Sequence, residues 1–316
     1  MNERRVVVGV DSGNTKTELV AATVDGSVIA RARGPGCNSH AVGAAAVAEL
    51  VARLVADARL ETPVDHGIFY LCGADVPDDV AGLQAALEAA GVARRLDVDN
   101  DTVALLRAGT ERPDAVAVIC GAGINCVGRA AGGRVVRYPA LGWETGDWGG
   151  AEMLGREALF VAARAEDGRG APSVLAEIAR RHFGAPSVEA VGVDVHYRRL
   201  PQQRLGELAP LVVAAAADGD AAAGALVDRL AGEIGLWADR AFRDLGISEA
   251  DVVLGGGMLR RAHDDFLRRV LERLPAGATP VLLDVPPVLG AALAALDAVG
   301  ATDAAKLRLR SELGGG

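Results

Sequence analysis

A polar turn near the N-terminus carries residue types that bind phosphate. The apolar run Val6–Val10 ends at Asp11, and glycine, small polar residues and a lysine follow at once. Backbone N–H groups in such a turn can hold phosphate, and an acid at a strand end can hold a metal-bound water. Lysine occurs only at positions 16 and 306, which indicates that a compact ammonium is required in this turn. The predicted phosphate-binding residues are Asp11, Ser12, Gly13, Asn14, Thr15 and Lys16, with Asp11 also on the metal; the alternative is an ordinary hairpin turn.

Two further glycine turns follow predicted strands. They are Gly121-Ala122-Gly123 and Gly255-Gly256-Gly257, the second running into Met258. Adjacent glycines let the backbone approach a flat ligand closely, but each turn alone is equally typical of a helix entry. Three such turns, each after a strand, form a pattern that is more specific than any one of them.

Asp101 is the candidate general base. It stands at the start of a predicted helix, where a carboxylate could accept the proton of an attacking hydroxyl. The alternative is a simple first-turn acid, which the helix dipole favours. Asp99 is close enough in sequence to take either role.

The segment 141–150 combines tryptophan, glycine and acids. Trp143 and Trp148 are two of the three tryptophans in the chain, and Asp147 lies between them. Tryptophan faces stack on sugar rings and aspartate accepts hydrogen bonds from hydroxyls, so the composition suits a polyol. The alternative is a tryptophan that anchors the loop to its domain. His40, in a loop with Asn38, could touch substrate, and no histidine spacing indicates a structural zinc.

The pattern of apolar runs predicts two α/β domains. Strands are expected at 6–10, 18–23 and 27–33, followed by alternating helices (42–58, 78–90, 102–108) and strands (68–71, 96–98). The three-strand opening restarts at 115–120, 125–129 and 134–137, which indicates an internal duplication. Helices at 151–165, 173–182, 203–217 and 220–245, strands at 251–254 and 281–284, an apolar helix at 288–299 and a frayed tail complete the prediction. The predicted domains are 1–113 with a C-terminal helix 288–310, and 114–287.

The composition and charge of the chain exclude several classes of protein. With 316 residues, 50% hydrophobic and 24% charged, the chain is globular and large enough for two domains. The net charge of −9 argues against nucleic-acid binding. The N-terminal apolar run is too short for a signal peptide, and no uncharged stretch is long enough for a membrane span. The four cysteines have no metal or disulfide spacing, so we expect free thiols in a reducing cytoplasm.

Five motifs occur in the order expected for the sugar-kinase/heat-shock-ATPase/actin superfamily. They are VGVDSGNTKT, DNDTVALL, VICGAGINC, LGWETGDWGG and VVLGGGML. Over roughly residues 5–300 the chain resembles the BadF/BadG/BcrA/BcrD ATPase family, which contains N-acetylglucosamine kinases. The resemblance implies two ribonuclease-H-like, actin-like ATPase domains with an active-site cleft between them, and Mg²⁺ and ATP as cofactors.

The resemblance also assigns roles. It makes 11–17 the first phosphate loop, 121–123 the second and 255–258 the adenosine loop. Asp101 falls at the catalytic Asp, and Asn38, Asn125 and Asp147 fall at sugar-binding positions. The chain departs from the family at Ala122 and Ile124, where hydroxyl residues are usual, at Trp148, which replaces an acid, and at Leu141, which replaces a tryptophan.

The implied activity is transfer of the γ-phosphate of ATP to a hydroxyl of an amino sugar such as N-acetylglucosamine or glucosamine. Homodimer formation is an expectation from the family. One alternative is a regulatory ATP-binding module without a sugar acceptor, which the loss of hydroxyls at Ala122 and Ile124 favours. Another is an activator of a 2-hydroxyacyl-CoA dehydratase-type enzyme. Such activators bind a cluster in a cysteine-containing loop, and Cys120-Gly121-Ala122 resembles that loop only superficially.

Overall fold

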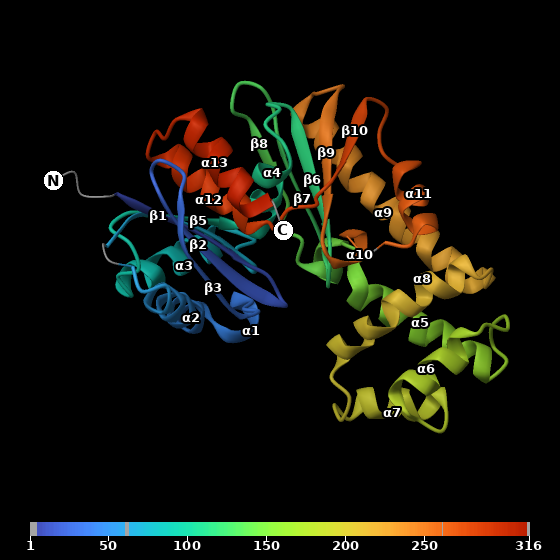
Figure 1. The fold of residues 1–316 in the computed structure, drawn as a ribbon. Helices are drawn as coiled ribbons and strands as arrows, with labels where there is room; N and C mark the ends of the chain where they lie inside the picture. Colours follow the sequence, from blue (N-terminus) through green and yellow to red (C-terminus); the bar gives the residue numbers. More distant parts are fainter. Residues whose placement is uncertain (1–4, 61–62, 261, 315–316) are drawn as a thin grey trace. The chain divides into compact units, whose positions relative to one another are not determined.

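The computed structural model describes residues 5–60, 63–260 and 262–314, which form a mixed α/β fold with two five-stranded sheets (Figure 1). The chain divides into two compact units. The first comprises Met1–Ala117, Arg137–Pro139 and Leu283–Gly316, and the second comprises Val118–Val136 and Ala140–Leu282. The predicted domain boundaries, 1–113 with 288–310 and 114–287, remain predictions.

The first sheet has the strand order β3-β2-β1-β4-β5. Its strands are β1 (Val6–Ser12), β2 (Lys16–Thr23), β3 (Val28–Pro35), β4 (Val64–Leu71) and β5 (Leu96–Asn100). β1 pairs antiparallel with β2 and parallel with β4, and β4 pairs parallel with β5. The opening hairpins and the later crossovers follow the predicted order of strands and helices.

Helices cover both faces of the first sheet (Figure 1). They are α1 (Ser39–Val42), α2 (Ala44–Asp57), α3 (Pro77–Ala89), α4 (Asp101–Gly109), α12 (Val288–Ala298) and α13 (Asp303–Gly314). Val6, Val8 and Val10 of β1 belong to the core formed with α2 and α3, and Val7 belongs to the core formed with α12 and α13. β1 reads as a continuous apolar run because both of its faces are buried.

Glycine allows α12 to lie directly on β1. A Cβ at Gly9 would come within 2.2 Å of the backbone nitrogen of Ala292, and one at Gly290 within 1.9 Å of the carbonyl oxygen of Ala104. α12 therefore joins the C-terminal part of the chain to β1 and α4 through backbone contacts.

The second sheet repeats the order of the first. Its strands are β6 (Ala115–Cys120), β7 (Ile124–Arg129), β8 (Val135–Arg137), β9 (Ala250–Gly255) and β10 (Ala278–Leu282). Their order, β8-β7-β6-β9-β10, matches β3-β2-β1-β4-β5 strand for strand. The predicted internal duplication is confirmed by this order.

The helices of the second unit lie between β8 and β10 in sequence. They are α5 (Gly150–Glu166), α6 (Leu175–Phe183), α7 (Val188–His196), α8 (Ala209–Ala217), α9 (Ala221–Leu245), α10 (Gly257–Arg260) and α11 (Asp264–Leu271), with short 3₁₀ turns at η1 (Gly142–Thr145) and η2 (Gln202–Leu208). α9 begins where Asp220 accepts a hydrogen bond from the Ala223 N–H, at 2.8 Å, and ends at the left-handed Gly246.

Four element predictions were wrong in detail. The helix 203–217 divides into η2 and α8, because Pro210 fits only the first turn of a new helix. The last strand is 278–282 rather than 281–284; Pro280 is tolerated because β10 is an edge strand. The single helix 288–310 is interrupted by the left-handed Gly300, with φ of 70°. The tail predicted to fray forms α13, which buries Leu309 and Leu313.

Among the described residues, no single helix has the length and apolar character needed to cross a membrane. The segments 202–217 and 221–245, bent by 112° relative to each other, pass that test only as a pair.

Candidate active site

Polar residues gather at one edge of the first sheet. Ser12 pairs with Leu71 across β1 and β4, and Leu71 pairs with Asn100 across β4 and β5. The carboxyl ends of these parallel strands therefore coincide, which is where α/β sheets bind ligands. This edge carries Asp11 in β1, Asp75 beyond β4 and Asp101 directly after β5.

The first predicted phosphate loop is a short hairpin turn. Asp11 and Ser12 still belong to β1, Lys16 opens β2, and the Gly13 N–H donates to the Lys16 carbonyl at 2.9 Å. The buried Ser12 hydroxyl lies 2.8 Å from that of Thr17. The Lys16 ammonium pairs with Glu18. Ser12 is thus buried and Lys16 is paired with a residue of its own strand, so the residues of the turn itself are 13–15.

The turn 13–15 is bound to the predicted sugar-binding loop. The Cys37 N–H donates to the Gly13 carbonyl at 3.1 Å, and the Asn38 amide nitrogen donates to Asn14 Oδ1 at 3.1 Å. A Cβ at Gly36 would come within 2.1 Å of the Asn14 carbonyl oxygen. The structure therefore brings Asn38 and the first phosphate loop together.

Asp101 is the first residue of α4. The N-cap is Asn100, whose Oδ1 accepts from the Thr102 N–H at 3.0 Å, so Asp101 is not needed as a cap. Burial, and to a smaller extent the nearby charge of Asp75, raises the pKa of Asp101 to about 7. A carboxyl group with a pKa near neutrality suits a general base.

Asp99 stands in a different environment from Asp101. Its carboxylate pairs with Arg137 and its Oδ1 accepts from the Asn100 N–H at 2.7 Å. Burial raises the pKa of Asp99, while Arg137 opposes that rise. The ion pair makes Asp99 the weaker candidate for the base.

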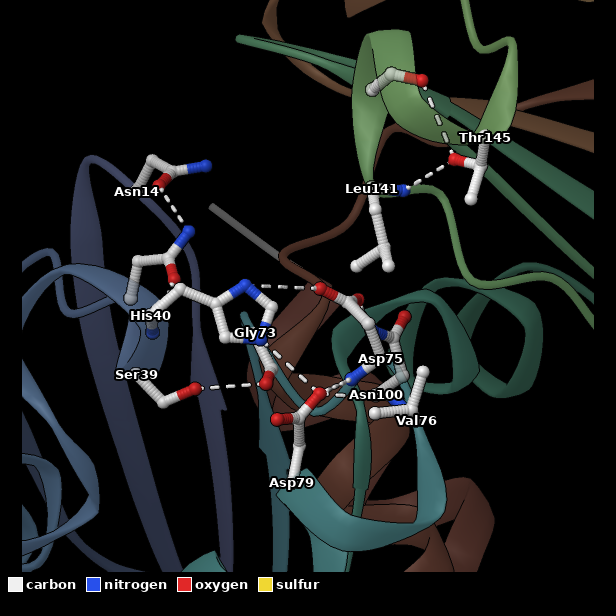
Figure 2. Close-up of polar contacts among 12 residues, drawn as sticks. Asn14, Ser39, His40, Gly73, Asp75, Val76, Asp79, Asn100, Leu141 and Thr145 are labelled. Carbon is white, nitrogen blue, oxygen red and sulfur yellow. Dashed lines mark hydrogen bonds and ion pairs between the residues drawn. The ribbon is translucent and has the colours of Figure 1, made fainter.

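A polar cluster between α1, α3 and β5 was missed in the sequence. In this cluster, called here the His40 cluster, the His40 ring lies between two acids: Nδ1 is 3.7 Å from Asp75 Oδ2 and Nε2 is 3.1 Å from Asp79 Oδ2 (Figure 2). Asn100 Nδ2 donates to Asp75 Oδ1 at 2.8 Å. Burial is the main cause that raises the pKa of Asp75 to about 6. An acid shortly after a buried strand, as at Asp11, was the signal that could have identified Asp75.

The two glycine turns of the second unit meet. The carbonyls of Gly121 and Ala122 accept from the N–H groups of Ala151 and Glu152, at 2.8 and 3.0 Å. A Cβ at Gly256, where φ is 94°, would come within 2.3 Å of the Cys120 carbonyl oxygen. The turns 121–123 and 255–257 therefore lie against each other, beside the start of α5.

The side chains around these turns are mainly apolar. Met258, predicted to contact adenosine, is buried in α10. Gly123 lies against Gly150, whose φ is 78° and whose Cβ would come within 2.4 Å of it. Asn125, at the second position of β7, has its Oδ1 bonded to the Cys126 N–H at 2.7 Å. Gly121, Ala122, Gly123, Gly255, Gly256 and Gly257 therefore offer backbone, not side chains, to a ligand.

The segment 141–149 holds its two tryptophans differently. Trp143 in η1 is 72% exposed, so the alternative of a tryptophan that anchors the loop does not apply to it. Trp148 is 4% exposed, with the Arg229 guanidinium 4.1 Å from its ring centroid, and anchors the segment. Its Nε1 has no hydrogen-bond partner among the described residues. Asp147 is buried and accepts hydrogen bonds from Thr145 Oγ1 and, at 3.3 Å, from the Gly142 N–H. Figure 2 shows a further bond of this segment, from the Leu141 N–H to Thr145 Oγ1.

The described part of the chain contains no group of three or more His, Cys, Asp or Glu side chains that could hold a metal ion unaided. Mg²⁺ in nucleotide sites is usually held by one or two carboxylates together with phosphates and waters. Asp11, at the end of β1, fits that arrangement.

Residues 8–295 match the model of the BadF/BadG/BcrA/BcrD ATPase family, so the chain belongs to this family. It is 25% identical to the N-acetyl-D-glucosamine kinase of Dictyostelium discoideum, over 93% of this chain and 98% of the relative. It is 24% identical to the N-acetylmuramic acid/N-acetylglucosamine kinase of Clostridium acetobutylicum, over 83% and 89%. The predicted family membership is confirmed.

A solved structure shares the fold. The crystal structure of a candidate N-acetylglucosamine kinase from Chromobacterium violaceum superposes with a TM-score of 0.69 at 23% identity, covering 92% of this chain and 98% of that one. This likeness, with the two sheets of equal strand order, confirms the predicted two-domain actin-like α/β class. The site residues stay predictions.

Proposed function

We propose that the protein is an ATP-dependent sugar kinase that phosphorylates a hydroxyl of an amino sugar, with N-acetylglucosamine and glucosamine as the first candidates. The observation that carries the proposal is the position of Asp101, at the ligand-binding edge of the first sheet with its pKa near 7. Both relatives are named as kinases of N-acetylglucosamine, and this chain matches them over most of their length, which supports the choice of an amino sugar.

The reaction is in-line phosphoryl transfer. Asp101 accepts the proton of the sugar hydroxyl while the hydroxyl oxygen bonds to the γ-phosphorus of ATP. The bond between the γ-phosphorus and the oxygen that bridges it to the β-phosphate breaks, and ADP leaves. Bound Mg²⁺ would neutralise charge on the β- and γ-phosphates. Asp11 would hold it through water at the end of β1.

Nucleotide and sugar bind to different kinds of surface. The turn 13–15 and the backbone of 121–123 and 255–258 would hold ATP, because open glycines in each turn let phosphates and a flat base approach the backbone. Asn38, Asn125, Trp143 and Asp147 would hold the sugar. Trp143 is exposed enough to stack on a ring, and Asn38 is already oriented by Asn14.

One observation favours a second function, a regulatory ATP-binding module. By the resemblance to the family, hydroxyl residues are expected where this chain has Ala122 and Ile124. The redox activator is disfavoured, since Cys120 and Cys126 are buried within the second unit and present no exposed thiol to a cluster.

The four cysteines are free thiols, which supports the proposal that the protein works in the reducing cytoplasm. We keep a homodimer as the proposed oligomeric state, on the family expectation alone.

A coupled ADP-release assay with Mg-ATP and a panel of amino, N-acetyl and plain hexoses tests the function. We expect one N-acetyl or amino sugar to raise ADP release at least 10²-fold over the water background, an estimate of the order of general-base catalysis. A flat panel with ATP still bound would support the regulatory module instead.

A further inference from the structure

Asp75 occupies the centre of the His40 cluster but belongs to none of the predicted binding loops. Its Oδ1 accepts from Asn100 Nδ2 at 2.8 Å, and its Oδ2 lies 3.7 Å from His40 Nδ1 (Figure 2). Its side chain is 14% exposed. A carboxylate held on two sides at the end of a strand is placed to connect the elements that it touches.

On one side, Asp75 supports the residue that starts α4. The Asn100 amide nitrogen donates to Asp75. The Asn100 amide oxygen accepts from the Thr102 N–H at 3.0 Å and from the Thr102 hydroxyl at 2.6 Å. All three groups are buried or nearly so. Because Asn100 immediately precedes Asp101, fixing the Asn100 side chain fixes the backbone that carries the proposed base.

On the other side, Asp75 reaches the loop of Asn38. His40 follows Asn38 by two residues, and its N–H donates to Asn38 Oδ1 at 2.9 Å. The Ser39 hydroxyl donates to the Gly73 carbonyl at 2.8 Å, so the same loop is also bound to the segment that leads to Asp75. One carboxylate thus contacts both the proposed base's helix and the proposed sugar-binding loop.

The charges around Asp75 come from several elements. His40 of α1 and Asp79 of α3 face it directly, and its own charge acts on Asp101 of α4. The Cys72 thiol lies close enough to Asp75, Asp101, Asp11 and Cys37 for their charges to raise its pKa, after burial as the main cause. Among these neighbours His40 is the group that opposes the rise in the pKa of Asp75.

We infer that Asp75 is a positioning residue for phosphoryl transfer: through Asn100 and His40 it holds Asp101 and the Asn38 loop in fixed relation. The charge of Asp75 also favours the protonated form of Asp101. This inference rests on the proposed function. In this role Asp75 touches neither ATP nor the sugar and acts through Asn100 and His40. Removing the carboxylate and removing only its charge should therefore have different consequences.

Two substitutions separate these roles. Asp75→Ala removes the acceptor for Asn100, and we expect kcat/KM for the sugar to fall about 10²-fold, the usual result of misplacing reacting groups by about 1 Å. Asp75→Asn keeps an acceptor and removes the charge, so kcat at high pH should stay closer to wild type, and the acidic limb of the pH–rate profile should move to lower pH. Asp78→Asn, an exposed acid three residues away, is the matched control and should change neither quantity.

A second measurement does not depend on kinase activity. The carboxyl carbon of Asp101, observed by ¹³C NMR, should titrate at lower pH in Asp75→Asn than in the wild type and unchanged in Asp78→Asn. Failure to detect phosphorylation of any sugar, with this shift present, would reject the proposed function and keep the coupling of the two acids. A folded Asp75→Ala variant with wild-type kcat/KM for the sugar would overturn the positioning role. An Asp101 titration and an acidic limb that both stay in place in a folded Asp75→Asn variant would overturn the coupling of the two acids.

Discussion

The two sheets have the same strand order but carry different chemistry at their ends. In the first sheet, β1, β4 and β5 lead to the ionisable residues Asp11, Asp75 and Asp101. In the second, the counterparts of β1 and β4 are β6 and β9, and they lead to the glycine turns 121–123 and 255–257. The duplicated fold thus carries ionisable side chains at the strand ends of one copy and glycine turns at those of the other.

This difference indicates a division of labour. At Gly121, Gly123 and Gly257 an added Cβ would meet nothing within 4 Å, so the backbone there is open to a flat or anionic ligand, whereas Gly256 packs against the Cys120 carbonyl. The first sheet instead buries acids beside one another, which raises their proton affinity. Substitutions at the acids of the first copy should therefore change the chemical step, and those at the glycine turns of the second should change nucleotide binding and stability.

The largest effect is expected from Asp101→Asn. Loss of the general base should lower kcat about 10³-fold, while ATP affinity stays within about tenfold because the nucleotide loops are untouched. Steady-state kinetics with ATP binding by calorimetry measures both. Asp97→Asn, at an exposed acid of the preceding strand β5, is the control and should retain activity. Comparable turnover in Asp97→Asn and Asp101→Asn would remove Asp101 from the mechanism.

In the second copy, Gly256→Ala should destabilise the fold by about 3 kcal/mol, because the residue has a left-handed φ of 94° and its new Cβ would collide with the Cys120 carbonyl. Chemical denaturation measures the free energy of unfolding. Gly257→Ala, whose Cβ would meet nothing within 4 Å, is the matched control. Equal stability of the two variants would contradict the packing described for these turns.

The pH dependence of the first copy follows from Asp101. Its pKa is raised to about 7, so the basic form is lost as pH falls, and kcat/KM should drop about tenfold per unit below pH 7. Since burial disfavours the charged carboxylate, the same group lowers stability as pH rises from about 4, the unfolded value, to 7. Asp101→Asn should accordingly unfold at a higher temperature than wild type at pH 8. A lower melting temperature there would contradict the environment assigned to Asp101.

Lys16→Ala should weaken ATP binding about tenfold, the size expected for one charged contact to phosphate. The chain supplies its own control, because Lys306 in α13 pairs with Asp297 and Asp303. Lys306→Ala should bind ATP like wild type in a calorimetric titration. An unchanged affinity in Lys16→Ala would mean that the Glu18 pair persists in the complex and that Lys16 serves the hairpin alone.

The smallest effect is expected at Trp143. Trp143→Ala should raise the KM for the sugar by roughly fivefold, the loss of about 1 kcal/mol of ring stacking, without changing the melting temperature. Trp148→Ala should do the reverse and lower the melting temperature, since that ring is buried against Arg229. A drop in stability for Trp143→Ala would assign the ring to the fold instead of the substrate.

Sequence reasoning identified the residues that share a strand end with a recognisable turn. Asp11 and Asp101 lie at a strand end and a helix start as predicted, because an apolar run followed by glycine and an N-cap mark such positions. Asn38 was singled out by the resemblance to the family. Asp75 and His40 were not identified as a pair, since they meet only through the β4–β5 register and the placement of α1 beside α3. The different burial of Trp143 and Trp148 likewise depends on the distant Arg229.

The central claim, that Asp101 serves as the base of a sugar kinase, is tested most directly by following label from [γ-³²P]ATP in a single turnover with N-acetylglucosamine. Wild type and Asp101→Asn are compared at equal occupancy of ATP. The account predicts labelled sugar phosphate from the wild type and none above background from the variant. Label that appears only as inorganic phosphate with the wild type, or sugar phosphate formed at similar rates by both proteins, would contradict it.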